Sequence, residues 1–275
     1  MQALTFGYLS VADLSPVEVI RAAARAGFAS AGIRISGRKP GDGFLPDVIG
    51  DARAIKEIRS CLDDSGVRLA SISTYHLYPN IALDDLLPVI ETTAALGADY
   101  IVAASYEPDH SRMADLMGKY SRRAAEAGLK IAFEAVSYSA VPTLESAVML
   151  TDMVNEPNFG LLLDPLHIAR GGSAFANIAQ IDPKKIFFAQ LCDASAAKPE
   201  GIDLATEAKS MRLYPGEGAL PLREFLSLLP AGLEIEAELP IRADRHLSGG
   251  ERAGIAHKKC TAYLSQGANK NRVAR

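Results

Sequence analysis

Short apolar runs of β type alternate with longer stretches of helical period along the chain. In the longer stretches apolar residues recur at i, i+3 and i+4, which is the period of one buried helix face. The pattern predicts eight strands, at residues 4–10, 30–35, 68–74, 100–105, 130–136, 159–164, 186–193 and 233–239. It predicts helices between them, of which the clearest span residues 15–27, 51–66, 85–98 and 111–128.

The ends of these helices carry the residues that helix ends favour. Ser15 followed by Pro16 is typical of an N-cap with proline at the first helical position. Glycine readily adopts the left-handed conformation that ends a helix. It stands just before the next strand at four places: Gly27, Gly66, Gly97 and Gly128.

Eight successive βα units without a domain-sized insertion favour a single (β/α)8 TIM barrel over residues 1–266. A doubly wound dinucleotide-binding sheet is the alternative, but it needs a glycine-rich turn after its first strand. The sequence there reads SVADLSP, which argues against it. The longest irregular stretch, residues 194–218, has a length typical of active-site lids. Residues 267–275 are polar and basic without an apolar period, and we interpret them as a flexible tail.

Composition narrows the class of protein. The chain of 275 residues is 48% hydrophobic and 23% charged, as expected for a folded protein, and no apolar run approaches the ~20 residues of a membrane span. A net charge of -4 argues against nucleic acid as the main partner. The three cysteines are far apart and form no CxxC pair, so we expect neither disulfides nor a zinc ribbon. The N-terminus lacks the pattern of a signal peptide, so we expect a cytoplasmic enzyme with no membrane partner. Homo-oligomerisation stays open.

Four acid or amide side chains each stand at the C-terminal end of a separate predicted strand: Glu134, Asp164, Gln190 and Glu236. Each has an ordinary interpretation as a rim residue, a turn cap or a half-buried amide. In a TIM barrel, however, strands five to eight would bring all four to one mouth. Oxygen ligands of this kind suit a divalent ion. We expect Mn²⁺ first, with Mg²⁺, Co²⁺ and Zn²⁺ left open.

Other residues extend the predicted site. His167 lies three residues after Asp164, where an imidazole can bind an ion, orient a ligand or transfer a proton. Arg212 lies in the polar loop RLYPGEG and has the fork geometry to bind a substrate carboxylate, phosphate or hydroxyl pair. Four further candidates for substrate binding follow strand ends: Arg34, His76, Tyr106 and Asp193.

The segments FEAV, LDPLH, AQLCDA, RLYPGEG and EIEAE occur in this order between residues 4 and 265. By these segments the chain resembles the xylose isomerase-like TIM barrel superfamily, also called the sugar phosphate isomerase/epimerase or endonuclease IV-like group. The resemblance implies that Glu134, Asp164 and Glu236 are metal carboxylates. It also implies that His167 is a proton-transferring or ligand-orienting histidine and that Arg212 is a substrate arginine.

The residue at the third ligand position separates branches of the superfamily. The sugar epimerases often carry histidine there, whereas Gln190 resembles the 3-dehydroshikimate dehydratase branch. Endonuclease IV carries further histidines for its zinc site, and the five scattered histidines of this acidic chain argue against DNA repair.

We therefore expect a metal-dependent isomerase or epimerase of a keto-sugar or related polyol. Glu134 and Glu236 would act as base and acid beside a metal-bound carbonyl, through an enediolate. The first alternative is a metal-dependent dehydratase or lyase of a cyclic polyhydroxy keto acid, with His167 as the acid that expels water. The second is a non-catalytic barrel that binds a sugar. Ligand spacing alone leaves these open, because the chemistry diverges only after proton abstraction.

Overall fold

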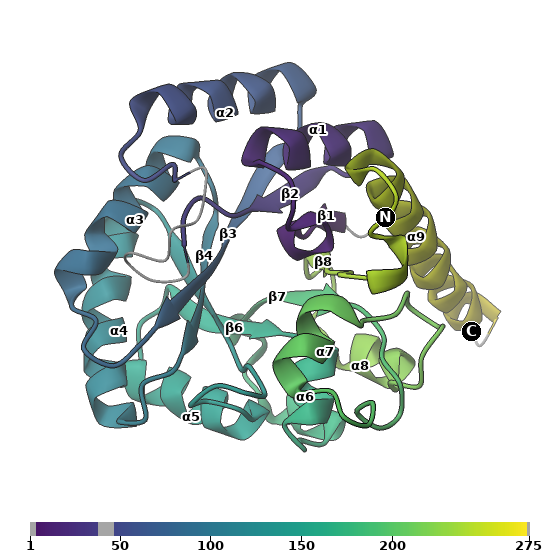
Figure 1. Ribbon diagram of the computed structural model, residues 1–275. Helices are drawn as coiled ribbons and strands as arrows, with labels where there is room; N and C mark the ends of the chain where they lie inside the picture. Colours follow the sequence, from purple (N-terminus) through teal and green to yellow (C-terminus); the bar gives the residue numbers. More distant parts are fainter. Residues whose placement is uncertain (1–3, 38–46, 274–275) are drawn as a thin grey trace.

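The computed structural model describes residues 4–37 and 47–273. Eight parallel strands follow one another around a closed barrel, and the last pairs with the first (Figure 1). The predicted (β/α)8 barrel is therefore confirmed. The strands are β1 (Leu4–Phe6), β2 (Ser30–Ile33), β3 (Arg68–Leu77), β4 (Tyr100–Ser105), β5 (Lys130–Glu134), β6 (Phe159–Leu163), β7 (Ile186–Leu191) and β8 (Ile235–Ala237).

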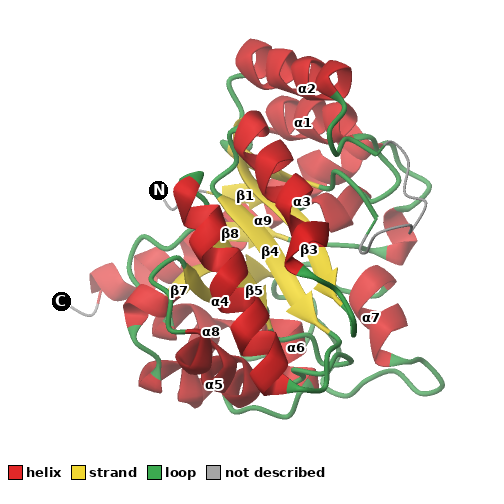
Figure 2. Cartoon of the chain, turned by 90° about the vertical axis from the view of Figure 1, so that its left-hand side faces the viewer, coloured by secondary structure: helices red, strands yellow, loops and turns green. Residues whose placement is uncertain are grey.

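Helices surround the strands, which lie slanted within them (Figure 2). The α-helices are α1 (Pro16–Ala26), α2 (Ala52–Ser65), α3 (Leu83–Leu96), α4 (His110–Glu126), α5 (Leu144–Val154), α6 (Pro165–Arg170), α7 (Leu204–Ser210), α8 (Leu222–Leu228) and α9 (Gly249–Val273). The 3-10 turns are η1 (Tyr8–Val11), η2 (Phe175–Gln180), η3 (Pro183–Lys185) and η4 (Arg242–Asp244).

The predicted helix ends are present as local contacts. The Ser15 side chain accepts from the backbone N–H of Glu18, while Glu18 accepts from the backbone N–H of Ser15 at 2.8 Å, and Pro16 opens α1. This capping box satisfies amide groups that the first turn leaves without partners. Three helices end at a left-handed glycine as predicted, and Gly128 lies one residue beyond the cap of α4.

Two sequence-based expectations, the end of the first strand and the irregular stretch at 194–218, were wrong for identifiable reasons. The first strand ends at Phe6, because Ser10 donates to the Ala237 carbonyl at 3.2 Å and accepts from the Leu239 amide at 2.8 Å, so the chain folds into η1. Residues 194–218 are not wholly irregular, because they contain α7. Helix α9 runs to Val273, past the boundary expected at residue 266, so the backbone there is helical despite its polar sequence.

The barrel interior divides into an apolar side and a polar side. On β4 to β7 a small cluster of buried side chains fills the interior: Val102, Ala132, Leu162 and Phe188. On β8 and the residues that flank it the inward positions are glutamates, because side chains two apart share one face of an extended chain. These are Glu234, Glu236 and Glu238, and the first of them pairs with Arg68 at the N-terminal end of the barrel. Polar groups thus run up one wall of the barrel toward its C-terminal mouth.

Most of the remaining core lies between the barrel and its helices, in one continuous apolar cluster. Within the described ranges no helix has both the length and the apolar character of a membrane span.

Gly160 on β6 tests how tightly this fold is packed. A Cβ added there would lie 2.6 Å from the Phe187 ring and 2.7 Å from the Lys185 carbonyl oxygen. We expect Gly160→Ala to lower the free energy of unfolding by roughly 1–3 kcal/mol, because the backbone must shift to relieve the overlap. The control is Gly254→Ala on the exposed side of α9, where a Cβ meets nothing within 4 Å. Equal denaturation midpoints for the two variants would contradict the prediction.

Candidate metal centre

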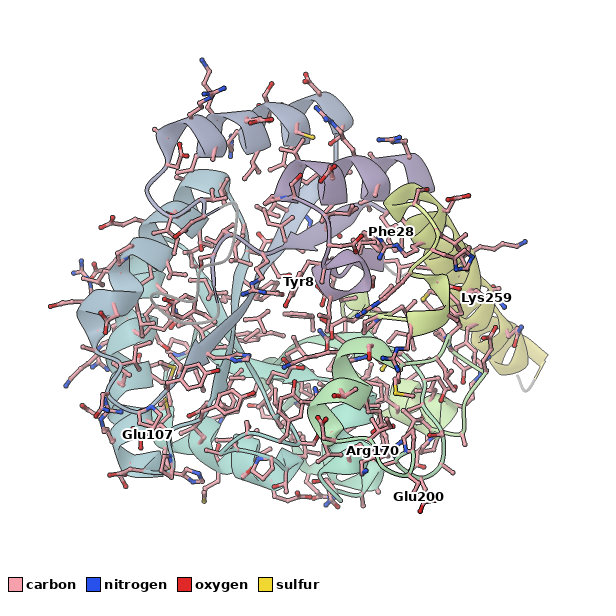
Figure 3. All side chains as sticks on the ribbon, in the orientation of Figure 1. Tyr8, Phe28, Glu107, Arg170, Glu200 and Lys259 are labelled. Carbon is pink, nitrogen blue, oxygen red and sulfur yellow. The ribbon has the colours of Figure 1, made fainter. Side chains whose placement is uncertain are left out.

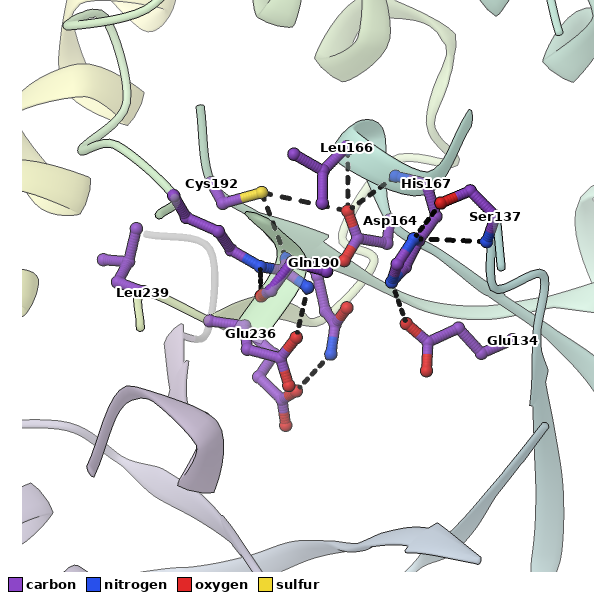
Figure 4. A network of polar contacts seen from close by, with 12 residues as sticks. Glu134, Ser137, Asp164, Leu166, His167, Gln190, Cys192, Glu236 and Leu239 are labelled. Atoms are coloured by element: carbon purple, nitrogen blue, oxygen red, sulfur yellow. Dashed lines mark hydrogen bonds and ion pairs between the residues drawn. The ribbon is translucent and has the colours of Figure 1, made fainter. Parts of the chain in front are cut away.

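Buried polar side chains from four consecutive strands meet at the C-terminal mouth of the barrel (Figure 4). Glu134 ends β5, Asp164 follows β6, Gln190 lies in β7 and Glu238 follows β8. All four are buried, with at most 6% of each residue exposed. In barrels of this kind the C-terminal mouth is where reactive groups from different strands converge.

Asp164 is held by both of its oxygens. One oxygen caps the short helix α6 by accepting from the backbone amides of Leu166 at 2.7 Å and His167 at 3.3 Å. The other lies 2.6 Å from Nη1 of Arg212. Burial alone would raise the pKa of Asp164, but Arg212 and the capping amides outweigh it and lower the pKa. Asp164 is therefore a fixed anion.

Arg212 is the cation at the centre of the cluster, and it is 1% exposed. Its second terminal nitrogen lies 3.0 Å from Glu238, and its Nε donates to the Ala208 carbonyl at 2.8 Å. Helix α7, which supplies that carbonyl, is itself anchored to α6 by an ion pair of Arg170 with the buried Glu207. The guanidinium therefore joins β6, β8 and α7 around the mouth.

The hydrogen bonds of His167 define its neutral tautomer. Its Nδ1 accepts from the backbone N–H of Ser137 at 3.3 Å, and a backbone amide can only donate. The ring proton of the neutral imidazole therefore resides on Nε2, which lies 3.8 Å from a Glu134 oxygen. Burial lowers the pKa of His167 to about 4, with Asp164 opposing the shift and Arg212 adding to it. His167 thus presents a neutral N–H to the cavity, which favours donation of a hydrogen bond to substrate over metal ligation.

The β8 glutamates occupy different levels of the barrel. Glu238 lines the cavity at the mouth together with Glu134, His167 and Arg212. Glu236 lies one pleat deeper, where it accepts from Gln190 Nε2 at 2.9 Å and from the Ser71 hydroxyl at 3.2 Å. The sequence pattern favoured Glu236 as ligand and catalyst, but the geometry favours Glu238, because the mouth lies beyond the last residue of β8.

Burial without water raises the pKa of the mouth carboxyls. Burial, opposed by Arg212 and reinforced by Glu236, raises the pKa of Glu238 to about 8. Burial also raises the pKa of Glu236 to about 7, against the hydrogen bonds from Gln190 and Ser71. The pKa of Glu134 is likewise raised well above its ordinary value, by burial and then by Glu238 and Asp164. A buried carboxyl with a raised pKa loses its proton readily near neutral pH only when a cation binds beside it.

The donor set fits a divalent cation. A carboxylate oxygen of Glu134 and one of Asp164 lie within 4.8 Å of each other and of a ring nitrogen of His167, so the two carboxylates are close enough to share an ion beside the imidazole. Gln190 contributes a second observation, since its Oε1 is buried and has no hydrogen-bond partner in the described part of the chain. A buried amide oxygen without a partner costs free energy unless a donor or a cation satisfies it. Carboxylate and amide oxygens are ligands that Mn²⁺ and Mg²⁺ accept.

The predicted substrate residues fall into two groups. His76 lines the cavity and packs against Tyr106, whose ring stacks on Tyr78 at a centroid distance of 5.0 Å. Arg34 is half-buried and donates to the Ser36 carbonyl at 2.7 Å. Asp193 does not line the cavity.

Asp193 instead organises the loop after β7. Its carboxylate accepts from the backbone amides of Gly216 at 2.9 Å and Leu220 at 3.0 Å, which closes the PGEG turn. The expectation that Asp193 binds substrate is therefore not supported by its position, because its carboxylate faces the loop amides and is not among the residues that line the cavity.

Several residues that line the cavity were not predicted from the sequence. Tyr8 on η1 lies toward the centre of the view down the barrel (Figure 3) and lines the cavity with Tyr138 and Lys209. Tyr138 packs edge-on against His167, and Lys209 lies 5.4 Å from the Tyr138 ring centroid. Only Glu238 carried a sequence signal, since it is the last of three glutamates on one strand face.

Comparison with known proteins supports this interpretation of the fold. The sequence profile of a family described as xylose isomerase-like TIM barrel matches residues 20–248. A solved structure of the IolI protein with a bound zinc atom superposes with a TM-score of 0.80 at 22% identity, covering 97% of this chain and 99% of that one. D-allulose 3-epimerase from Methylomonas sp. superposes with a TM-score of 0.70 at 16% identity, covering 96% of both chains. At these identities the likeness shows the fold.

Curated relatives match part of the chain. Inosose isomerase from Bacillus subtilis is 31% identical over 160 residues, which are 54% of this chain and 56% of that protein. 3-Dehydroshikimate dehydratase from Pseudomonas aeruginosa is 32% identical over 138 residues, which are 48% of this chain and 21% of that protein. The matches thus span about half of the first relative and a fifth of the second.

The raised carboxyl pKa values predict how stability depends on pH. A group whose pKa is higher in the folded state contributes stability that is lost as pH rises through that pKa. His167 opposes this change only slightly, because its unfolded form is about half neutral at pH 6.5 and the folded form is neutral. The change above pH 6.5 therefore reports mainly Glu236 and Glu238, together with Glu134, whose pKa is also raised. In chelator-treated protein we expect the free energy of unfolding to fall by on the order of 2 kcal/mol between pH 6.5 and 8.5.

Denaturant unfolding at several pH values measures this fall. Glu238→Gln should flatten the slope, because the amide does not titrate, whereas Glu217→Gln on the exposed surface should leave it unchanged. A metal-free wild type that gains stability over this pH range would refute the assignment.

Proposed function

The chain belongs to the xylose isomerase-like TIM barrel family, and on that premise we propose that it is a divalent-metal-dependent isomerase or epimerase of a keto-sugar or related polyol. The observation that carries the proposal is the arrangement at the mouth. Two buried carboxyls, Glu134 and Glu238, and the neutral N–H of His167 line one cavity. The amide oxygen of Gln190, which has no hydrogen-bond partner among the described residues, lies on the neighbouring strand β7. The relatives named inosose isomerase support the same class of reaction.

Glu134, Asp164, Gln190 and Glu238 would hold the ion, which we propose to be Mn²⁺ because all four ligands offer oxygen. When bound, such an ion polarises a substrate carbonyl and makes the neighbouring C–H more acidic. The ion would also supply the positive charge that three buried carboxyls at one mouth require beyond Arg212.

The protein's own groups would then move the proton. Glu134 on β5 and Glu238 after β8 approach the cavity from different strands, so one can remove a proton and the other can return it. Burial raises the pKa of both carboxyls, that of Glu238 to about 8, and a bound ion would lower both toward the range in which a carboxyl accepts and donates a proton readily. Return to the opposite face gives an epimer, and return to the adjacent carbon gives an isomer.

The surrounding side chains would orient the substrate. The Nε2–H of His167 is placed to donate to a hydroxyl or carbonyl oxygen. His76, Tyr8 and Tyr138 line the same cavity with aromatic faces, which suits the apolar C–H faces of a polyol ring. Arg212 is engaged with two carboxylates, so its first contribution is to the charge of the site.

Gln190 favours one second candidate function. By this residue the chain resembles the dehydratase branch, and one relative, 32% identical over 138 residues, is named 3-dehydroshikimate dehydratase. In that reaction the same base would remove the proton and, once protonated, would pass it to the departing hydroxyl, while the Nε2–H of His167 donates a hydrogen bond to that hydroxyl. In both cases we propose a cytoplasmic enzyme with a small-molecule partner.

Metal content tests the site directly. Elemental analysis of the purified wild type, loaded with Mn²⁺ and desalted, should find about one divalent ion per chain. Glu134→Gln/Asp164→Asn should bind none, while asparagine keeps the cap of α6 through its side-chain oxygen. Glu217→Gln, which removes an exposed carboxylate paired with Lys259, is the matched control. Metal-free wild type after loading would refute the metal centre.

Solvent exchange tests the reaction. Inosose incubated with the Mn²⁺-loaded protein in deuterium oxide should take up deuterium at the carbon beside its carbonyl, as measured by NMR. Glu134→Gln should lower the rate by roughly 10²–10⁴-fold, since it removes the general base. Loss of water from 3-dehydroshikimate, with no exchange into inosose, would replace the leading proposal by the dehydratase.

A further inference from the structure

Glu236 is a buried carboxyl that the proposed reaction does not use. It is 1% exposed and lies below the mouth, outside the group of residues that line the cavity. Its Oε1 accepts from the Nε2 of Gln190 at 2.9 Å, and the register pairs Gln190 with Glu236 across β7 and β8. Burial of a carboxyl costs free energy, so a buried carboxyl is expected to serve a structural or functional role. The hydrogen bond to Gln190 indicates what that role is.

We propose that Glu236 is a positioning residue that fixes the direction of the Gln190 amide, so that its oxygen and not its nitrogen is presented to the cation. The inference rests on the proposed metal centre. The two ends of a glutamine amide have nearly the same shape but opposite polarity, and rotation by half a turn exchanges them. A rotated amide would offer N–H groups to a cation and place its oxygen against a carboxylate oxygen of Glu236.

The hydrogen bonds of Gln190 and Glu236 treat the two ends of the amide differently, as this role requires. The Nε2 has its partner in Glu236, whereas the Oε1 is buried without one among the described residues (Figure 4). A glutamine that served packing alone would not need an acceptor for its amide nitrogen while its amide oxygen was left without a donor. Glu236 therefore acts as an outer partner that orients a ligand, a role in which carboxylates commonly serve.

Glu236 is itself confined from several sides. The Ser71 hydroxyl donates to its Oε2 at 3.2 Å. A Cβ at Gly32 would lie 2.9 Å from that oxygen, and a Cβ at Gly7 would lie 3.1 Å from its Cγ. The glycines on two neighbouring strands thus leave room for this side chain and little more, so the acceptor that faces Gln190 is held in place.

The effect of Glu236 on the amide can be separated from its charge. Glu236→Gln removes the charge but keeps an oxygen that accepts from Gln190, and its NH₂ can donate to Ser71. Glu236→Ala removes both the charge and the acceptor. The control is Glu234→Gln, which alters the next glutamate on the same strand face, whose contacts lie at Ser30 and Arg68 and not at the mouth.

The experiment is a titration of Co²⁺ into chelator-treated protein, with the visible absorption of bound Co²⁺ as a second readout and thermal unfolding of the metal-free variants as a check on folding. We expect the alanine variant to bind Co²⁺ 10- to 100-fold more weakly than wild type, with an altered spectrum. The glutamine variant and the Glu234→Gln control should stay within about threefold of wild type.

Each other outcome overturns the inference in a recognisable way. Equal losses in the alanine and glutamine variants would mean that Glu236 acts through its charge. Unchanged affinity in both, with lower thermal stability, would mean that it only supports the fold. If wild type itself binds no Co²⁺, the proposed metal centre fails and the inference fails with it, whereas normal wild-type binding with unaffected variants overturns the inference alone.

Discussion

The buried guanidinium of Arg212 is the interaction on which the mouth of the barrel depends. It lies against Asp164 and Glu238, and its Nε is bonded to Ala208, so strands β6 and β8 and helix α7 meet at one charged group. Removing one partner of such a pair would leave an uncompensated charge in the interior, at a cost of roughly 3–5 kcal/mol. The contacts of Arg212 that position the two carboxyls thus also hold α7, which lies in the segment between β7 and β8.

A second constraint is the division of the barrel interior. The apolar side chains on β4 to β7 form an apolar side of the interior, and the glutamates at β8 form a polar side. Low dielectric on the apolar side is what raises the pKa of Glu134 and Glu238, and Arg212 limits that rise. Packing therefore determines the proton affinity of the site as much as the identity of its acids does.

Much of the fold could be predicted because the two hydrophobic periods and the helix caps are local. The order of the strands, the capping box at Ser15 and the glycine ends follow from residues close in sequence. The four strands that carry the candidate ligands were predicted too, but which glutamate of the last strand lines the cavity was not. Which of Glu236 and Glu238 reaches the mouth depends on where β8 ends, and Ser10 of η1 influences that end through bonds to Ala237 and Leu239.

The roles of Asp193 and Arg212 also depend on contacts between residues far apart in the sequence, which a local pattern does not show. Asp193 lies three residues past Gln190, as a substrate residue would, but loop amides 23 and 27 residues away take its oxygens. Tyr8 and Tyr138 belong to no sequence pattern that predicts a site. Each is a single aromatic residue outside the strands, and it lines the cavity only because the barrel closes.

The bond from Ser137 to His167 has a consequence for handedness. A backbone amide cannot reverse its polarity, so the wall formed by His167 is permanently a donor, while the wall formed by Glu238 is an acceptor whenever it is ionised. A polyol ring turned over within the cavity would meet the opposite pairing of hydroxyl and partner at each wall. The cavity is therefore chiral in its hydrogen bonding as well as in its shape, and it can distinguish the two faces of a nearly symmetrical ring.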